Sequence, residues 1–222
     1  QNYNNQSDYQ YPNLNVAFFG ENLFYLNDRL SITPGFRIEH IKTESLGSYK
    51  KINLDGAGNV ILNQTINNNN IRKRSFILLG TGISYKGPIE IYGNISQNYR
   101  SVTFADISII NPAYSIDPYI SDEKGYTIDC GLRGELNKYL SFDLSIFNLY
   151  YNDRIGFVQR AYNDGSVKSE KGNVGDALIY GFESLIDFNL NKALMLNNNN
   201  IFNFYINSSF INSEYIQSQR NG

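Results

Sequence analysis

Hydrophobic and polar residues alternate along most of the chain with a period of two, the pattern of β-strands whose two faces meet different surroundings. From Leu30 to Thr43, one parity begins Leu, Ile, Pro, Phe, Ile, whereas the other begins Ser, Thr, Gly, Arg, Glu. The same split recurs from Ile89 to Arg100, from Tyr126 to Asn137 and from Leu140 to Tyr150. No segment of useful length has a helical period. The pattern therefore predicts an all-β chain.

Four further segments alternate less sharply, so that about eight strands of ten to fourteen residues are predicted in total. These four are Leu14–Leu26, Ser75–Tyr85, Leu178–Phe188 and Ile201–Asn212. Strands in soluble proteins average roughly five or six residues. The predicted strands are therefore long enough to cross the hydrocarbon of a membrane, for which about 9–11 tilted residues suffice.

The connections between these strands alternate in length. Short turns are predicted at residues 27–29, 86–88 and 137–139, with a longer Asn-rich turn over Leu190–Asn200. Long loops are predicted over Glu44–Arg74, Ser101–Lys124 and Asn152–Ala177, all at the other end. Outer-membrane barrels show this asymmetry, because their periplasmic turns are short and their extracellular loops are long.

Two of the long loops contain hairpin signals of their own. Asp55–Asn59 and Asn163–Gly165 each include Asp-Gly, which supplies the positive φ that tight turns require. The run Asn67–Asn70 is interpreted as polar loop filler. We therefore expect structured loops, as recognition loops often are.

Half-buried strands of soluble proteins also alternate, but the length of these strands and the charge of their polar parity favour a membrane barrel. The polar parity carries Arg37, Glu39, Glu90, Arg100, Asp129, Arg133, Glu135 and Asp143. If the apolar parity faces lipid, every backbone polar group must be paired, which requires a closed barrel. Aromatic residues near strand ends would form an interfacial girdle; they are Tyr25, Tyr85, Tyr99, Tyr126, Tyr150 and Tyr180.

Composition narrows the possible functions of the 222 residues. The net charge is −2, so no basic surplus indicates nucleic-acid binding. The single Cys and the single His exclude a disulfide framework, a thiolate cluster and a multi-His metal site. No phosphate loop, nucleophile elbow or metalloprotease motif is present. We expect no enzyme activity, no metal site and no cofactor.

Four stretches of the chain resemble the barrel of TonB-dependent outer-membrane receptors, and most closely the ferric-citrate type of siderophore receptor. The first is LSITPGFRIEHI at residues 30–41, which follows FGENLFYLNDR at residues 19–29. The others are Asn94–Val102; Ser121–Thr127 with Gly131 and Arg133; and Gly172–Val174 with Tyr180–Glu183. These are structural motifs of the barrel rather than ligand signatures.

The resemblance implies that residues 1–222 supply about eight strands from the middle of a 22-stranded antiparallel transmembrane barrel. It places the chain in the outer membrane of a Gram-negative bacterium, in contact with lipid. It further implies uptake of a ferric siderophore or other iron chelate, driven by TonB acting on a plug domain. The plug, the TonB box and the closing strands are not in these residues, and both ends have loop-like sequences, so we expect a longer native protein.

Two groups of residues are candidates for the site. Arg37, Glu39, Glu90, Arg133 and Glu135 would line the lumen, either contacting plug and ligand or forming a ladder of opposite charges between neighbouring strands. Arg100 ends a strand on the loop side, where a guanidinium suits an anionic chelate, or it pairs with Asp106. The neighbouring candidates for ligand binding are Tyr99, Thr103 and Phe104.

Two other interpretations fit part of the pattern. A complete eight-stranded barrel with a side-chain-filled interior would act as a structural protein or adhesin. A soluble β-domain that binds glycans would instead pack its apolar parity inward. The identity of the ligand is left open by the sequence, because ferric citrate, another siderophore, cobalamin and an oligosaccharide are all compatible with it.

Overall fold

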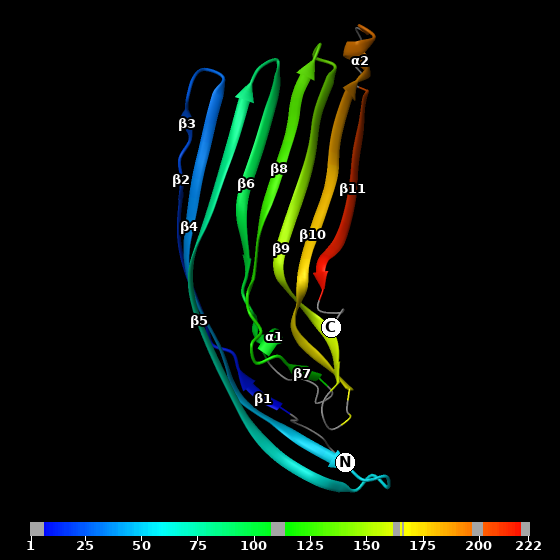
Figure 1. The fold of residues 1–222 in the computed structure, drawn as a ribbon. Coiled ribbons are helices and arrows are strands. Elements are labelled where there is room, and N and C mark those ends of the chain that lie inside the picture. The colour runs from blue at the N-terminus through cyan, green and yellow to red at the C-terminus, as the bar shows by residue number, and fades with distance from the viewer. Residues whose placement is uncertain (1–6, 108–113, 162–164, 166, 197–201, 219–222) are drawn as a thin grey trace.

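The chain forms one strongly curved antiparallel sheet (Figure 1). The structure is a computed structural model that describes residues 7–107, 114–161, 165, 167–196 and 202–218. Eight strands follow one another through the sheet, namely β1 (Ser7–Gln10), β4 (Leu30–Leu54), β5 (Val60–Lys86), β6 (Ile89–Arg100), β8 (Glu123–Leu136), β9 (Leu140–Ala161), β10 (Val167–Asn189) and β11 (Asn203–Ser218).

Three shorter strands and two helical turns complete the described elements. The strands β2 (Asn13–Glu21) and β3 (Phe24–Tyr25) pair with β4, and β7 (Tyr114–Ile116) pairs in parallel with β10. The helices α1 (Phe104–Ile107) and α2 (Leu190–Ala193) span four residues each. No helix in the described part of the chain is long and apolar enough to span a membrane.

The predicted alternation is confirmed as two different faces of the sheet. On β4, Phe36 and Ile38 are exposed, whereas Glu39 and Thr43, on the opposite parity, are buried. Figure 1 shows α1 inside the curve of the sheet, where it contacts β4, so the buried parity is assigned to the concave face and the exposed parity to the convex face. The register carries this parity across the sheet. Phe36 lies opposite Leu79, and Ile38 opposite Ile77, so a continuous apolar surface covers the convex side.

The predicted loop over Glu44–Arg74 is wrong, because β4 and β5 continue through most of it. They are 25 and 27 residues long and stay in register up to a turn at Asp55–Asn59. The Asp55 carboxylate accepts hydrogen bonds from the backbone N–H groups of Ala57 and Asn59, at 2.9 and 2.7 Å. The hairpin predicted at this turn therefore exists, but as the tip of two long strands.

The run Asn67–Asn70 is likewise part of a strand and not loop filler. These residues lie in β5 and pair with Ser45–Ser48 of β4. The third long loop also largely disappears, since β9 and β10 reach Ala161 and Val167. The turn predicted at Asn163–Gly165 falls mostly outside the described residues.

The short turns lie where the sequence places them. Asn27 accepts hydrogen bonds from the backbone N–H groups of Arg29 and Leu30, both at 2.9 Å. Asn137 and Lys138 have φ values of 50° and 63°, the left-handed pair that a tight hairpin between β8 and β9 requires. One end of the sheet therefore carries compact turns and the other carries the long hairpins (Figure 1).

The sheet is open, so the interpretation as a complete eight-stranded barrel is not supported. Among the described strands, β2 pairs only with β4, and β11 pairs only with β10, which leaves an edge at each side. The soluble interpretation is also wrong in its packing. Phe18, Ile77 and Ile95 of the apolar parity are 67%, 59% and 46% exposed rather than packed inward.

Candidate functional site on the concave face

Near the short turns, the concave face carries a polar ladder across four strands. Glu90 of β6 and Arg133 of β8 lie directly opposite each other. The guanidinium donates from Nε and Nη2 to the two oxygens of Glu90, at 3.0 and 3.1 Å. Ser84 of β5 donates to Glu90 at 2.6 Å, and Tyr92 donates to Asp143 of β9 at 2.8 Å. This is the cross-strand ladder expected as one alternative for Glu90 and Arg133.

A cavity of about 580 Å³ lies over this ladder. Its lining includes Glu90, Arg133, Glu135, Asp143 and Asp187. The predicted lumen residues Glu90, Arg133 and Glu135 thus face one shared polar space on the concave side.

Arg37 and Glu39 pair along one strand instead of across two. The Arg37 Nε donates to Glu39 at 2.6 Å, and both residues belong to β4. The neighbouring strand supplies an amide, since Asn15 of β2 donates to the other Glu39 oxygen at 2.7 Å. The ladder of opposite charges predicted between strands is therefore wrong for this pair.

The loop between β6 and β8 folds into the curve of the sheet, where Figure 1 shows α1 and β7. Its core consists of Val102, Ile107 and Ile120, which are 0%, 4% and 1% exposed. Ile116 of β7 and Ile155 of β9 pack against them. These few apolar contacts let a loop inside a polar lumen keep a defined shape.

Two buried carboxylates join this loop to the wall. Asp106 and Glu123 are each 1% exposed. Asp106 accepts from Arg100 at 3.2 Å and from Lys171 of β10 at 2.7 Å. Glu123 accepts from Arg100 at 2.9 Å and from Arg154 of β9 at 3.2 Å. Arg100 thus links both acids, which confirms the predicted pairing with Asp106.

A third carboxylate, Asp122, ties the loop to β5. It accepts from Arg74 at 2.7 Å and from the backbone N–H of Val102 at 2.7 Å. Tyr99 donates its hydroxyl to Asp122 and stacks on Phe76 with ring centroids 3.7 Å apart. Burial first, and then the Asp122 carboxylate, raise the pKa of Tyr99, which stays protonated and takes part in the loop network instead of a lipid-facing girdle.

The network carries more positive than negative charge. Four cations, Arg74, Arg100, Arg154 and Lys171, form ion pairs with the three carboxylates of Asp106, Asp122 and Glu123. A fifth, Arg72, donates to the carbonyl of Ile120 at 2.6 Å. Burial and the neighbouring Arg74 lower the pKa of Arg72, and Asp122 only partly offsets them. The side chains of Arg100 and Arg154 remain 42% and 36% exposed, so part of this positive charge faces the lumen.

A β-bulge in β9 and β10 places the Arg154 side chain next to Glu123. The register between β9 and β10 shifts on both sides of Gly175, and Asp153 has φ 57°. Such a bulge changes which face the following side chains occupy. Arg154 therefore lies over the Tyr151 ring, 5.0 Å from its centroid, and reaches Glu123.

Aromatic rings gather beside the loop network. Phe104 of α1 lies 5.0 Å from Tyr11, which in turn lies 5.8 Å from Tyr9, measured between ring centroids. Thr103 donates its backbone N–H and its hydroxyl to Asp106, at 2.8 and 2.9 Å. The structure thus places Tyr99, Arg100, Thr103 and Phe104 around one loop. Ligand contact by these four residues stays a prediction.

Sequence reasoning did not select Glu123, Arg154, Lys171 or Tyr11. Glu123 could have been noticed because it lies in Ser121–Thr127, one of the stretches that resemble the family's barrel. Arg154 and Lys171 lie 31 and 48 positions away from Glu123 along the chain, and nothing local connects them to it. In the described part of the chain, no group of three or more His, Cys, Asp or Glu side chains could hold a metal ion.

Comparison with protein families identifies one family over nearly the whole chain. Residues 1–221 match the family described as TonB dependent receptor-like, beta-barrel. No curated protein is significantly similar in sequence.

Solved structures share the fold at low sequence identity. The copper transporter OprC is 19% identical over 89% of this chain and 29% of its own, with a TM-score of 0.61. The ferric yersiniabactin uptake receptor FyuA from Yersinia pestis is 17% identical over 94% and 28%, with a TM-score of 0.67. The ferric-catecholate import receptor Fiu from E. coli is 12% identical over 91% and 29%, with a TM-score of 0.59. The chain thus spans less than a third of these proteins.

Proposed function

The chain belongs to the TonB-dependent receptor-like β-barrel family, and on that premise we propose that it is the part of an outer-membrane receptor that takes up a ferric siderophore or similar iron chelate. Proteins of this family lie in the outer membrane of Gram-negative bacteria and are transporters, not enzymes. Uptake requires binding at the lumen, followed by TonB-driven movement of a plug domain that the complete receptor would supply.

The main support for the proposal is the excess of positive over negative charge in the network around the inward-folded loop. Four cations pair with three carboxylates there, Arg72 adds a fifth positive charge, and Arg100 and Arg154 keep part of their surface open to the lumen. An anionic ferric chelate presents carboxylate or phenolate oxygens, which guanidinium groups bind well. FyuA and Fiu, which share the fold, are described as receptors for ferric chelates.

Within this network we assign different roles to the four predicted residues. Phe104, together with Tyr11, offers ring surface to the ligand beside the charged cluster. Arg100 contributes positive charge while it holds Asp106 and Glu123 in place. Thr103 and Tyr99 position the carboxylates, since each donates to one of them.

The test uses the complete receptor expressed in cells that lack other iron-uptake receptors. Radioactive ferric citrate is the first ligand, followed by other ferric chelates, and a protonophore provides the energy-dependence control. Truncating both rings with Tyr11→Ala and Phe104→Ala should weaken ligand binding about tenfold or more, because each aromatic contact contributes on the order of 1 kcal/mol.

Phe18→Ala is the matched control, since this ring is 67% exposed on the convex face and should not affect uptake. Loss of uptake only in the double variant, with normal amounts of folded receptor, supports the assignment. If the unaltered receptor takes up none of the ferric chelates, the proposed function is contradicted. Uptake that is unchanged in the double variant contradicts the assigned binding surface.

A further inference from the structure

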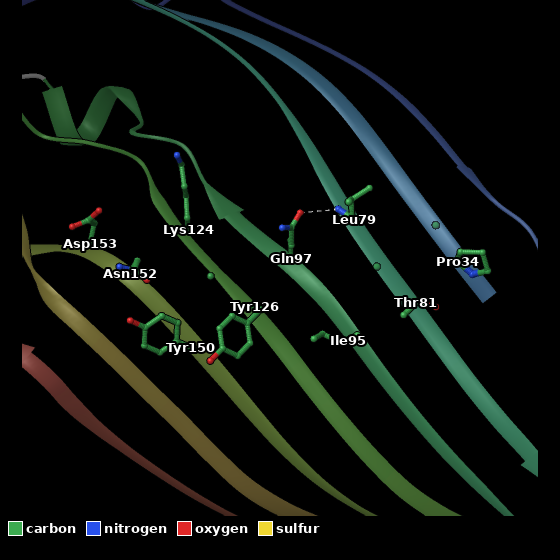
Figure 2. Close-up of a pocket in the computed structure, with 13 residues that line it drawn as sticks. Pro34, Leu79, Thr81, Ile95, Gln97, Lys124, Tyr126, Tyr150, Asn152 and Asp153 are labelled. Carbon is green, nitrogen blue, oxygen red and sulfur yellow. Dashed lines mark hydrogen bonds between the residues drawn. The ribbon is translucent and has the colours of Figure 1, made fainter. Parts of the chain in front are cut away.

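In the described part of the chain, one edge of β5 has no strand beside it over much of its length. β5 pairs with β6 only as far as Gly80 and Ser96. Figure 1 shows β5 continuing past the end of β6 toward the tip of the long hairpin. The first edge amide beyond the paired part, that of Leu79, donates to the Gln97 side chain at 2.9 Å, as Figure 2 shows.

Beyond Leu79, the backbone groups on this edge are open. In an antiparallel ladder, successive residues direct their N–H and C=O groups to opposite sides. The residues that share the direction of Leu79, away from β4, are Ile77, Ser75, Lys73 and Ile71. Within the described part of the chain, these backbone groups form no hydrogen bond. We call residues 71–77 the open edge of β5, and an edge of this kind is a template for a further strand.

The open edge leaves the hydrocarbon of the membrane along its length. On the convex face, Ile38 lies opposite Ile77, whereas Lys42 lies opposite Lys73, two convex pairs farther along. An unpaired edge within the hydrocarbon would be costly, because nothing there can pair with backbone groups. At the level of Lys73 the edge is in water, where an incoming strand can reach it.

A hollow of about 740 Å³ runs along this part of the edge. Its lining includes residues 71–74, and because successive side chains of a strand point to opposite faces, the hollow follows the edge and not one face. The opposite side of the hollow is the loop segment that contains Ile120 and Asp122. Arg72 donates to the Ile120 carbonyl at 2.6 Å, and Arg74 pairs with Asp122 at 2.7 Å. These two arginines fix the spacing between the edge and the loop.

Positive charge exceeds negative charge in the lining of the hollow. The cations are Arg72, Lys73, Arg74 and Lys124, and the carboxylates are Asp122 and Asp153. Lys73 and Lys124 are exposed and form no ion pair within the described part of the chain. Like charges that lie directly opposite each other repel, as Lys73 and Lys42 do. An acidic side chain on a strand added beside β5 would relieve this repulsion.

We propose that the open edge of β5 binds an extended acidic segment of a partner protein, which adds to the sheet as a further strand. Backbone hydrogen bonds to residues 71, 73 and 75 give affinity, and acidic side chains beside Lys73 and Lys124 give specificity. A second copy of the chain is a poorer occupant, because its own edge brings the three successive cations of residues 72–74 to a hollow that is already positive.

The test titrates the complete receptor, purified in detergent, with a fluorescent peptide. The peptide is Val-Glu-Val-Glu-Val-Glu-Val, blocked at both ends, and fluorescence anisotropy reports its binding. No ferric chelate is present, so the outcome is independent of the proposed uptake. One control peptide has Gln in place of each Glu, and another is N-methylated at its five central residues and cannot pair as a strand. Both should bind about tenfold more weakly or less.

A first pair of receptor variants examines the charge. Lys73→Gln/Lys124→Gln should weaken binding of the Glu peptide about tenfold, which is about threefold for each exposed charge pair. Lys50→Gln/Lys51→Gln is the matched control and should bind normally, since these exposed lysines of β4 do not line the hollow.

A second pair of variants examines the backbone without changing any charge. Ile71→Pro removes one N–H from the open edge and leaves the ladder to β4 intact, so it should weaken binding about fivefold. Thr65→Pro is the matched control, because its N–H points to the same side but lies outside the hollow. Equal binding by these two variants would overturn the proposal.

Hydrogen exchange on the receptor without peptide shows whether the edge is open. The amides of residues 71, 73 and 75 should exchange rapidly and become protected when the Glu peptide is added. Slow exchange without peptide would mean that another part of the receptor covers the edge, which contradicts the proposal. Equal binding of the Gln peptide or of the N-methylated peptide contradicts it too. A receptor dimer that Ile71→Pro dissociates would instead assign the edge to a second copy of the chain.

Discussion

Replacing Glu123 with glutamine removes the charge that holds two arginines and one backbone amide at the base of the inward-folded loop. Its side chain is 2% exposed and accepts from Arg100 at 2.9 Å and from Arg154 at 3.2 Å. It also accepts from the backbone N–H of Ile155 at 2.9 Å. Glutamine has nearly the same shape, so the variant tests the charge and not the packing.

The expected loss in free energy depends on which interactions of Arg100 and Arg154 remain after the substitution. Removing one partner of a buried ion pair costs about 3–5 kcal/mol. Here Arg100 and Arg154 are 42% and 36% exposed, so water replaces part of the lost interaction, and the amide oxygen still accepts one hydrogen bond. We therefore expect the free energy of loop opening to fall by about 2–3 kcal/mol, which is about a 30- to 150-fold increase in opening.

Hydrogen exchange on the complete receptor measures this opening directly. The informative amides are those of Val102 and Thr103, which are hydrogen-bonded to Asp122 and Asp106. Glu183→Gln is the control, because Glu183 is an exposed acid on β10. Exchange at Val102 and Thr103 that is as slow in Glu123→Gln as in the control would refute the idea that this carboxylate holds the loop.

Two further predictions concern the loop and the wall. Burial is outweighed by hydrogen bonds from Lys171 and Thr103, which hold the pKa of Asp106 below its usual 3.8. Protection of the loop amides from hydrogen exchange should therefore be full above pH 3.8, fall as the pH drops through the lowered pKa, and depend less on acid in Asp106→Asn. An acid response that is the same in this variant would contradict the assignment. Gly125→Ala should reduce the heat-modifiable folded band severalfold, because the added Cβ would collide with the Tyr150 carbonyl. Gly82→Ala is the control and should fold normally, since its Cβ meets nothing closer than 3.9 Å. Equal yields of the two variants would show that the sheet relaxes around the methyl group.

The strands within the lipid band could be predicted from sequence, but their full length could not. Inside the band, one face must be apolar, so Leu30–Ile38 alternates clearly. Beyond it, both faces meet water or other loops, and alternation is no longer required, although backbone pairing continues. Asn67–Asn70 shows this plainly, since four asparagines pair in register with Ser45–Ser48. The predicted boundaries of the loops therefore mark where the alternation ends and not where the strands end.

The candidate site was only partly predictable, for a related reason. Arg100 and Asp106 are six positions apart, so their pairing could be proposed from the sequence. The other members of the network come from distant strands, and Arg154 reaches Glu123 only because the bulge at Asp153 changes the face on which it lies. Alternation alone places residue 154 on the convex parity of Asn152, away from the loop. A pattern of period two therefore identifies the wall of the barrel, whereas the site depends on the point at which that period is broken.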